Sequence, residues 1–214
     1  MANERTWALI HSQRSAVADM LEKLTPDQWA TPSLCGTWTV KLTAAHILAG
    51  AEQTVPAFLA GMATSGFRFN VLMRRNASRL ARLEPGEIIT RIRARTTTTT
   101  NRPPRKVMTM LGEIVVHGED IRYPLGMYAA IPAQATDACL EMYKTGIFPV
   151  GGKKRVRGLR LVATDSDWSY GSGPEVTGPG MSILLAMAGR AVGTDGLSGE
   201  GLTVLRSRIG ADAA

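Results

Sequence analysis

Histidine is rare in this chain, and two of its three histidines lie where they could bind a metal. The three are His11, His46 and His117. Glu113 stands four residues before His117 in an apolar segment of helical periodicity, so both side chains would lie on one face, one turn apart. His46 lies in a second such segment. If the two helices pack side by side, the three side chains would converge on one divalent ion and leave open positions for water or a substrate thiolate.

A simpler interpretation competes with the metal site. A glutamate and a histidine at this spacing occur often by chance, and a buried histidine is usually just hydrogen-bonded within the core. However, His46 is flanked by Ala45 and Ile47, and the segment around His117 is equally apolar. An unpaired imidazole or carboxylate in such surroundings is costly, whereas one metal ion would satisfy all three groups. We therefore predict a metal site formed by His46, Glu113 and His117.

The apolar spacing predicts that the first 148 residues form an antiparallel helical bundle. Apolar residues recur at helical spacing over 4–24, 39–62, 67–83, 87–96 and 104–123. Thr39 suits the N-cap of the second helix, and Pro56 is expected to kink it. The threonines at 96–100 and the prolines that follow favour a loop. One more helix is predicted over 135–145.

The chain changes character after Gly146. Alternating apolar residues predict strands over 157–163 and 168–171, and an apolar helix should follow over 179–190. Residues 202–209 suit another helix or strand. The predicted fold is mainly α, with a helical bundle over 1–148 followed by a small α/β C-terminal domain over 149–214.

The composition is that of a folded globular protein. The 214 residues are 44% hydrophobic and 20% charged, with a net charge of +7. Cys35 and Cys139 show no CxxC spacing, so we expect neither a disulfide framework nor a cysteine zinc site. The first residues lack the continuous apolar core of a signal peptide, and no run of about 18 apolar residues is present. We expect a cytoplasmic protein without a membrane span, either a monomer or a homodimer.

Several motifs together resemble one family. They are LCGTWTV at 34–40, which leads to Ala45 and His46, and GEIVVHGEDIRYPLG at 112–126. Near the C-terminus they are GLRLVATD at 158–165, GPEVTGP at 173–179 and LLAMAGR at 184–190. In combination they strongly resemble the mycothiol-dependent maleylpyruvate isomerase family, a branch of the DinB-like four-helix metalloproteins.

The resemblance implies a metal-dependent enzyme that uses a borrowed thiol. A divalent metal, usually zinc, would be held by His46, Glu113 and His117. The open site would receive mycothiol, the low-molecular-weight thiol of actinobacteria, and metal binding would deprotonate it. The thiolate would then add to a small electrophile. If it leaves after the adduct has rotated the reaction is an isomerisation, and if it stays attached the reaction is an S-transfer.

Two further residues match the family pattern and one departs from it. Asp120 matches the acid that follows the second histidine, where it would orient His117 or handle a proton; alternatively it is a surface acid near a helix end. Arg190 would contact an anionic substrate, or else interact with the C-terminal dipole of its own helix. Leu42 stands where the family commonly has an acid four residues before the first histidine. We interpret this as the loss of a polar contact rather than of a ligand.

Other residues have simpler interpretations. Cys35 is taken as structural, because no basic residue adjoins it in sequence and a supplied thiol would do the chemistry. Trp38 and Trp168 are expected to be packing anchors. The basic clusters at 102–106 and 153–157 could instead bind nucleic-acid phosphates, although they lack interleaved aromatic residues and no helix-turn-helix or zinc-finger pattern accompanies them. A catalytically silent bundle that only holds a metal is the third possibility.

Overall fold

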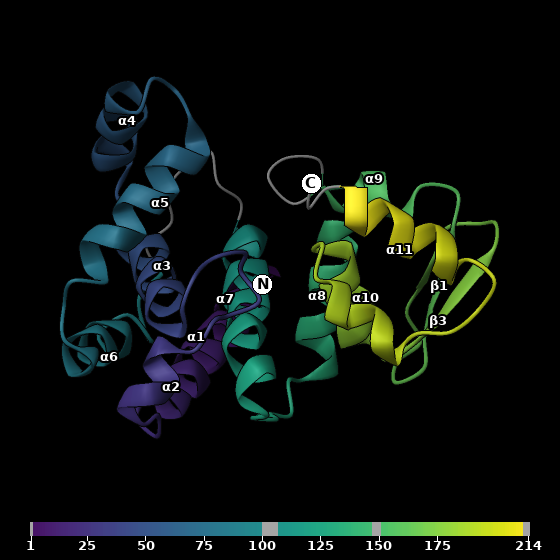
Figure 1. The fold of residues 1–214 in the computed structure, drawn as a ribbon, viewed down its shortest axis with the longest axis horizontal. Helices are drawn as coiled ribbons and strands as arrows, with labels where there is room; N and C mark the ends of the chain where they lie inside the picture. Colours follow the sequence, from purple (N-terminus) through teal and green to yellow (C-terminus); the bar gives the residue numbers. More distant parts are fainter. Residues whose placement is uncertain (1, 100–106, 147–150, 212–214) are drawn as a thin grey trace. The chain divides into compact units, whose positions relative to one another are not determined.

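The protein divides into two compact units, 1–129 and 130–214. The structure, a computed structural model, describes residues 2–99, 107–146 and 151–211 (Figure 1). The sequence had suggested a boundary at residue 148 instead. Helix α8 (Ala133–Tyr143) packs against α10 (Gly180–Met187), and this contact joins α8 to the second unit.

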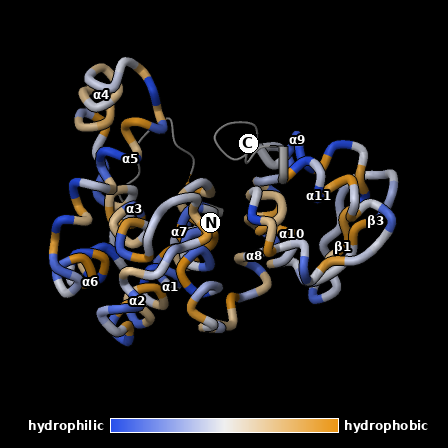
Figure 2. Tube along the Cα trace, in the orientation of Figure 1, coloured by the Kyte–Doolittle hydropathy of each residue, from blue (hydrophilic) through white to orange (hydrophobic). Residues whose placement is uncertain are grey.

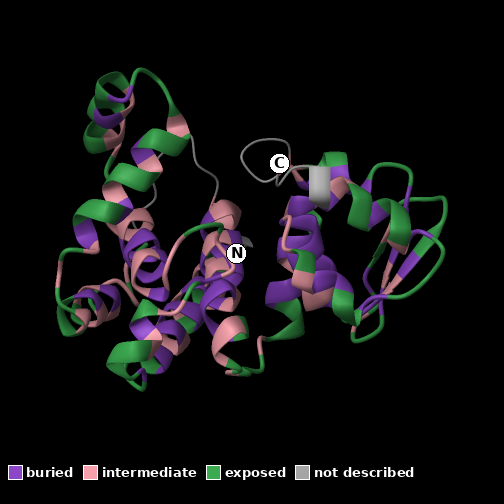
Figure 3. Ribbon diagram, in the orientation of Figure 1, coloured by how far each residue is buried: buried purple, intermediate pink, exposed green. Residues whose placement is uncertain are grey.

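The first unit is built from helices. In chain order they are α1 (Ala2–Leu21), α2 (Pro26–Ala30), α3 (Val40–Glu52), α4 (Val55–Thr64), α5 (Phe69–Leu80), α6 (Pro85–Arg93) and α7 (Val107–Arg122), followed by the 3-10 turn η1 (Tyr123–Leu125). Helix α3 packs against α5, α6 and α7, and α1 packs against α6 and α7. Figure 3 shows the buried residues concentrated along α3 and α7, whereas most of α4 is exposed.

The long helix expected over 39–62 is two helices. α3 begins after Thr39, whose hydroxyl accepts a hydrogen bond from the Leu42 amide at 3.3 Å, and it ends at Glu52. α4 then starts at Val55, with Thr54 as its N-cap and Pro56 in its first turn. Proline is accepted in a first turn because the amide it lacks would have no helical partner there. The chain therefore breaks the helix before Pro56 rather than kinking it.

The second unit combines a small sheet with short helices. Its elements are α8, α9 (Gly152–Val156), β1 (Arg160–Ala163), β2 (Ser169–Tyr170), β3 (Glu175–Gly178), α10, the 3-10 segment η2 (Ala191–Gly196) and α11 (Leu202–Ala211). The strand order is β2-β1-β3, with β1 antiparallel to β2 and parallel to β3. The segment 202–209, which suited a helix or a strand, is helical.

Strand β3 was missed because its sequence carries little strand pattern. It is four residues long and lies between Pro174 and Pro179. Its place is fixed by pairing across the sheet, where Leu161 of β1 lies beside Val176 of β3 and both side chains are fully buried. Tertiary contacts of this kind leave no mark on the local sequence.

The predicted fold class, a mainly helical bundle followed by a small α/β unit, is confirmed. Figure 2 shows apolar and polar residues interspersed along the helices, as amphipathic packing requires. Among the helices that the structure describes, none combines the length and the apolar character needed to cross a membrane.

Candidate metal centre

Helices α3 and α7 bring His46 close to Glu113 and close to His117. His46 lies on α3, and Glu113 and His117 lie one turn apart on α7, which packs directly against α3. His46 Nε2 is 3.8 Å from Glu113 Oε1, and the imidazole rings of His46 and His117 meet edge to face with their centroids 4.8 Å apart. His46 therefore contacts both residues of α7, which the i and i+4 spacing places on one helix face, and the binding of one metal by all three stays a prediction.

A glycine on α3 leaves space for the Glu113 carboxylate. Gly50 follows His46 by one helical turn, and a Cβ atom built at Gly50 would lie 2.8 Å from Glu113 Oε2. Any larger residue would push the carboxylate away. Two imidazoles and one carboxylate form a donor set that catalytic zinc sites use, and the space at Gly50 keeps the carboxylate beside His46. The donor types of His46, Glu113 and His117 therefore suit a divalent metal.

The loop before α3 supports His46 from outside. The Trp38 ring meets the His46 ring edge to face, with centroids 5.1 Å apart. The Trp38 carbonyl accepts hydrogen bonds from the Ser33 amide at 2.8 Å and the Ser33 hydroxyl at 3.0 Å. With 6% of its surface exposed, His46 is held between this loop and α7. Trp38 thus packs against the candidate site itself.

Asp120 holds the other side of His117. Its Oδ2 lies 2.7 Å from His117 Nδ1, and Asp120 is 0% exposed. Burial lowers the pKa of His117, but its hydrogen bonds with Asp120 and Cys35 and their charges outweigh burial and raise that pKa to about 9. A buried carboxylate paired with a histidine fixes the ring's orientation, as partners of metal-binding histidines do. The alternative of a surface acid does not describe Asp120.

Cys35 lies beside His117, which the sequence did not indicate. The Leu34 amide donates to the Asp120 carbonyl at 3.0 Å and so joins the loop to the end of α7. Within the part of the chain that the structure describes, the ligand atoms of Cys35, His117 and Asp120 all lie within 4.8 Å of one another. Cys35 was judged structural because its sequence neighbours are not basic, but its nearest base comes from a distant helix. No local sequence signal could have found this contact.

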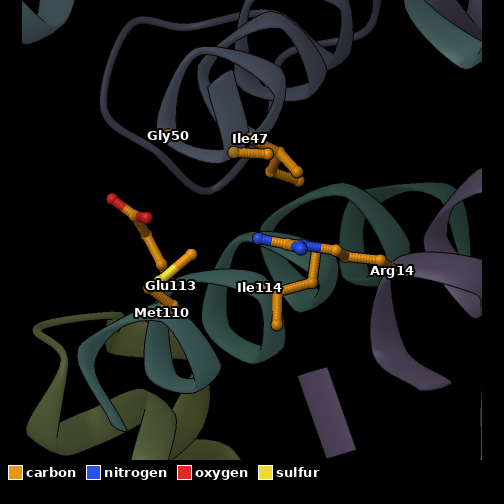
Figure 4. Close-up of a pocket in the computed structure, with 7 residues that line it drawn as sticks. Arg14, Ile47, Gly50, Met110, Glu113 and Ile114 are labelled. Atoms are coloured by element: carbon orange, nitrogen blue, oxygen red, sulfur yellow. The ribbon is translucent and has the colours of Figure 1, made fainter. Parts of the chain in front are cut away.

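A small pocket opens next to Glu113. Its walls come from α1, α3 and α7, and Figure 4 shows the guanidinium end of Arg14 extending between Ile47 and Ile114 towards the side where Glu113 lies. Arg14 is 4% exposed. Arg14 was not among the candidate functional residues predicted from the sequence. The only sequence signal for Arg14 is its helical spacing, which places it on the same helix face as the apolar residues Ile10 and Val17.

Arg190 belongs to the second unit. It follows α10, and its Nη1 donates a hydrogen bond to the Ala188 carbonyl at 2.7 Å. This is the contact expected from the alternative interpretation, a basic residue at a helix C-terminus. Its role towards a substrate stays a prediction.

The structure describes one of the two basic clusters, in which Lys153, Lys154 and Arg157 are exposed. The cluster at 102–106 lies outside the described residues. In the other, Arg155 is buried within the second unit and its Nη1 donates to the Met187 carbonyl at 2.8 Å. Arg155 therefore contributes to packing inside its unit rather than to an exposed basic face.

The fold belongs to the class of helical bundles with polar side chains between facing helices, here with a small α/β unit appended. Residues 10–106 match the family described as mycothiol maleylpyruvate isomerase N-terminal domain. This match agrees with the resemblance drawn from the sequence motifs. His46 lies inside the matched range, and Glu113 and His117 lie beyond it.

Two solved structures share the fold over almost the whole chain. One is the crystal structure of the mycothiol-dependent maleylpyruvate isomerase, with a TM-score of 0.64 and 17% identity, covering 94% of this chain and 93% of that chain. The other is a histidine-to-alanine mutant of the mycothiol-dependent maleylpyruvate isomerase, with a TM-score of 0.62 and the same identity and coverage. At this identity the likeness establishes the fold alone. No curated protein sequence matches the chain.

Proposed function

We propose that this protein is a metal-dependent and mycothiol-dependent enzyme of the maleylpyruvate isomerase type. In this proposal His46, Glu113 and His117 hold one divalent metal, with zinc favoured by two imidazoles and a carboxylate. The substrates are mycothiol and a small electrophilic molecule. We place the reaction in the reducing cytoplasm of an actinobacterium.

One observation carries the proposal, namely that His46 lies beside both Glu113 and His117, with Gly50 leaving space for the Glu113 carboxylate. The 3.8 Å between His46 Nε2 and Glu113 Oε1 and the edge-to-face contact of the two histidines bring donors from two helices together. A helix interior disfavours glycine by about 1 kcal/mol relative to alanine. Glycine occurs at position 50 despite this cost, and a Cβ atom there would displace the Glu113 carboxylate.

The chain's own residues prepare the site for thiol chemistry. A bound divalent metal would lower the pKa of a coordinated thiol, so that the thiolate is the form present at neutral pH. Asp120 engages Nδ1 of His117, which leaves Nε2 as the nitrogen for the metal. Because Asp120 is fully buried, we assign it the task of orienting His117 rather than exchanging protons with solvent.

The second substrate decides between the two reaction types. The thiol adds to an activated double bond; it is expelled after rotation in an isomerisation and stays attached in an S-transfer. Arg190 stays a proposed contact for an anionic group of that substrate. Incubation with mycothiol and candidate electrophiles separates the outcomes, because a rearranged product with regenerated thiol means isomerisation and a stable conjugate means transfer.

Metal analysis of purified protein tests the core of the proposal. We expect about one divalent ion per chain, lost largely in His46→Ala and in His117→Ala. His11→Ala is the matched control, because His11 lies in the same unit but its Nε2 pairs with the Thr98 carbonyl at 3.1 Å. Full metal content in both site variants would exclude this ligand set.

A cobalt-loaded sample distinguishes this set from the neighbouring Cys35, His117 and Asp120 group. If His46, Glu113 and His117 bind the ion, no thiolate-to-cobalt charge-transfer band is expected, and Cys35→Ala leaves the visible spectrum in place. A strong near-ultraviolet band that disappears in Cys35→Ala would move the metal to Cys35. Cys139→Ala, in the other unit, controls for the loss of a thiol elsewhere.

A further inference from the structure

The segment 53–83, which we call the α4–α5 hairpin, concentrates the positive charge of the chain. It contains five arginines and neither aspartate nor glutamate, so its charge is +5 within a chain of net charge +7. All five arginines are exposed, and none of them pairs with a carboxylate of the described residues. They are Arg68, Arg74, Arg75, Arg79 and Arg82. The hairpin therefore presents positive charge that no described acid neutralises.

The outward side of α4 is apolar. Gly61 faces α5, because a Cβ atom built there would lie 2.6 Å from Leu72 Cδ1. Leu59 precedes Gly61 by two residues, and a rotation of about 100° per residue places it on the opposite side of the helix, where it is 61% exposed. The exposed residues at helical spacing from Leu59 are Pro56, Ala60 and Ala63 (Figure 3). An exposed apolar helix face of this kind is typical of a surface that binds a partner.

Phe67, in the turn between α4 and α5, combines exposure with a strained backbone. Its side chain is 78% exposed, and its φ is 57°. In the part of the chain that the structure describes, every other residue with a positive φ is a glycine. This conformation is unfavourable for a bulky residue, whereas glycine adopts it freely. Neither core packing nor the turn accounts for phenylalanine at this position, and a partner that receives the ring does.

We propose that the α4–α5 hairpin is a docking surface for a membrane that carries anionic lipids. The Phe67 ring and the apolar side of α4 would enter the boundary between headgroups and acyl chains, and the arginines would contact the lipid phosphates. The hairpin would lie on the membrane and not cross it. This inference goes beyond the proposed function and does not depend on it, since it concerns binding by residues outside the candidate metal centre.

Other occupants fit the hairpin less well. A second copy of the chain would bring five arginines against five more, and the hairpin has no carboxylate to pair with them. Nucleic acid would engage the arginines through its phosphates but would leave the apolar side of α4 in water. An anionic lipid surface supplies phosphates and hydrocarbon together.

Co-sedimentation of the full chain with lipid vesicles tests the charge requirement. We expect binding to vesicles of equal parts phosphatidylglycerol and phosphatidylcholine, and little binding to phosphatidylcholine alone. Added salt should weaken the binding, because it screens the arginines. The double variant Arg68→Gln, Arg74→Gln should lose affinity by about fivefold for each arginine. The double variant Lys153→Gln, Arg157→Gln is the charge-matched control, since it removes two exposed cations of the second unit, and it should bind as the wild type does.

Phe67→Gly separates insertion of the ring from folding. Because glycine adopts this backbone conformation freely, stability in urea should not fall, whereas vesicle affinity should fall by about tenfold. Leu59→Ser, on the outward side of α4, should also weaken vesicle binding. Tyr128→Ser is the matched control, because Tyr128 is 97% exposed outside the hairpin, and it should bind as the wild type does.

Three results would overturn the proposal. The first is equal binding to anionic and neutral vesicles, and the second is full vesicle affinity in both Phe67→Gly and Leu59→Ser. The third is an absence of vesicle binding by the wild type. In that case sedimentation equilibrium and titration with a single-stranded oligonucleotide identify the occupant. A dimer that dissociates in Leu59→Ser would assign the face to a second copy, and oligonucleotide binding that falls in Arg68→Gln, Arg74→Gln would assign it to nucleic acid.

Discussion

Gly50 lies one helical turn beyond His46, and a Cβ atom there would stand 2.8 Å from Oε2 of Glu113. The nearest atoms belong to the end of a flexible side chain rather than to backbone. An added methyl group would therefore move the carboxylate and leave α3 in place. A substitution at Gly50 can therefore change metal affinity without changing the stability of the fold. Substitutions of buried ligands usually change both.

The first prediction follows from that separation. Gly50→Ala should weaken zinc affinity by about tenfold or more, in the range seen when the surroundings of a ligand are disturbed. The free energy of unfolding of the metal-free protein should stay the same or rise by about 0.5 to 1 kcal/mol, because alanine favours the helix. Competition with a chelator measures the affinity, and urea unfolding measures the stability.

Gly86→Ala is the matched control. Gly86 lies in α6, and a Cβ built there meets nothing within 4 Å. It should stabilise the helix without any change in zinc affinity. If Gly50→Ala bound zinc as tightly as this control, the space at Gly50 would have no part in seating Glu113.

The residues that meet from two helices were predictable from the sequence. Glu113 and His117 share a helix face by their spacing, and His46 is one of few histidines in an apolar segment, so a shared site required only that the helices pack together. The bundle followed from the same periodicity. The sequence pattern is therefore sufficient to predict site residues that recur at the spacing of the helix on which they lie.

The surroundings of that site were not predictable, for a different reason in each case. In the sequence Gly50 is only an unfavourable helix residue, and its role appears once the structure places the Glu113 carboxylate beside it. Cys35 reaches His117 from a loop that is joined to the end of α7 by the hydrogen bond from the Leu34 amide to the Asp120 carbonyl. Arg14 resembles one more polar residue until the neighbours of α1 are known. Each depends on which elements pack together, and one sequence does not specify that.

The second prediction concerns Asp120. Asp120→Asn keeps the shape of the side chain but removes the charge that holds His117 Nδ1 at 2.7 Å. Zinc affinity should fall by about 10- to 100-fold. Glu119→Gln is the control, because Glu119 pairs with Arg122 at 2.9 Å, so this change affects stability rather than the site. Equal zinc affinity of the two variants would show that Asp120 does not support His117.

The third prediction concerns Leu42, where the related family commonly has an acid. Leu42 is the third residue of α3, and its amide already donates to the N-cap hydroxyl of Thr39. Glutamate at that position would complete a capping box and place a negative charge at the helix start. Leu42→Glu should therefore be more stable than Leu42→Ala by about 0.5 to 1 kcal/mol in urea unfolding.

Zinc content gives the second readout for these two variants. Both should bind as much zinc as the wild type, because Leu42 is interpreted as a helix-start position and not as a ligand position. A gain of zinc affinity in Leu42→Glu alone would mean that the acid acts at the metal, and the interpretation of Leu42 would have to change.

The fourth prediction uses the buried thiol of the second unit. Cys139 lies in α8 with 0% exposure, and burial raises the pKa of its thiol from 9.0 to about 12. The folded state thus keeps a proton that the unfolded chain loses above pH 9. The stabilisation from this difference is complete below pH 9 and is lost as pH rises from 9 to 12, by at most about 1.4 kcal/mol per pH unit.

Cys139→Ala should therefore cost less stability at high pH than at neutral pH. Urea unfolding at pH 8 and pH 10 should show the gap between wild type and variant narrowing by about 1 kcal/mol, since alanine has no proton to lose. Leu140→Ala removes a neighbouring side chain that is also fully buried and does not titrate, so its gap from wild type should stay constant. Comparing the wild-type-to-variant differences in unfolding free energy at the two pH values cancels the effect of alkaline pH on all other groups. If both gaps narrow equally, burial of the Cys139 thiol is not what destabilises the protein above pH 9.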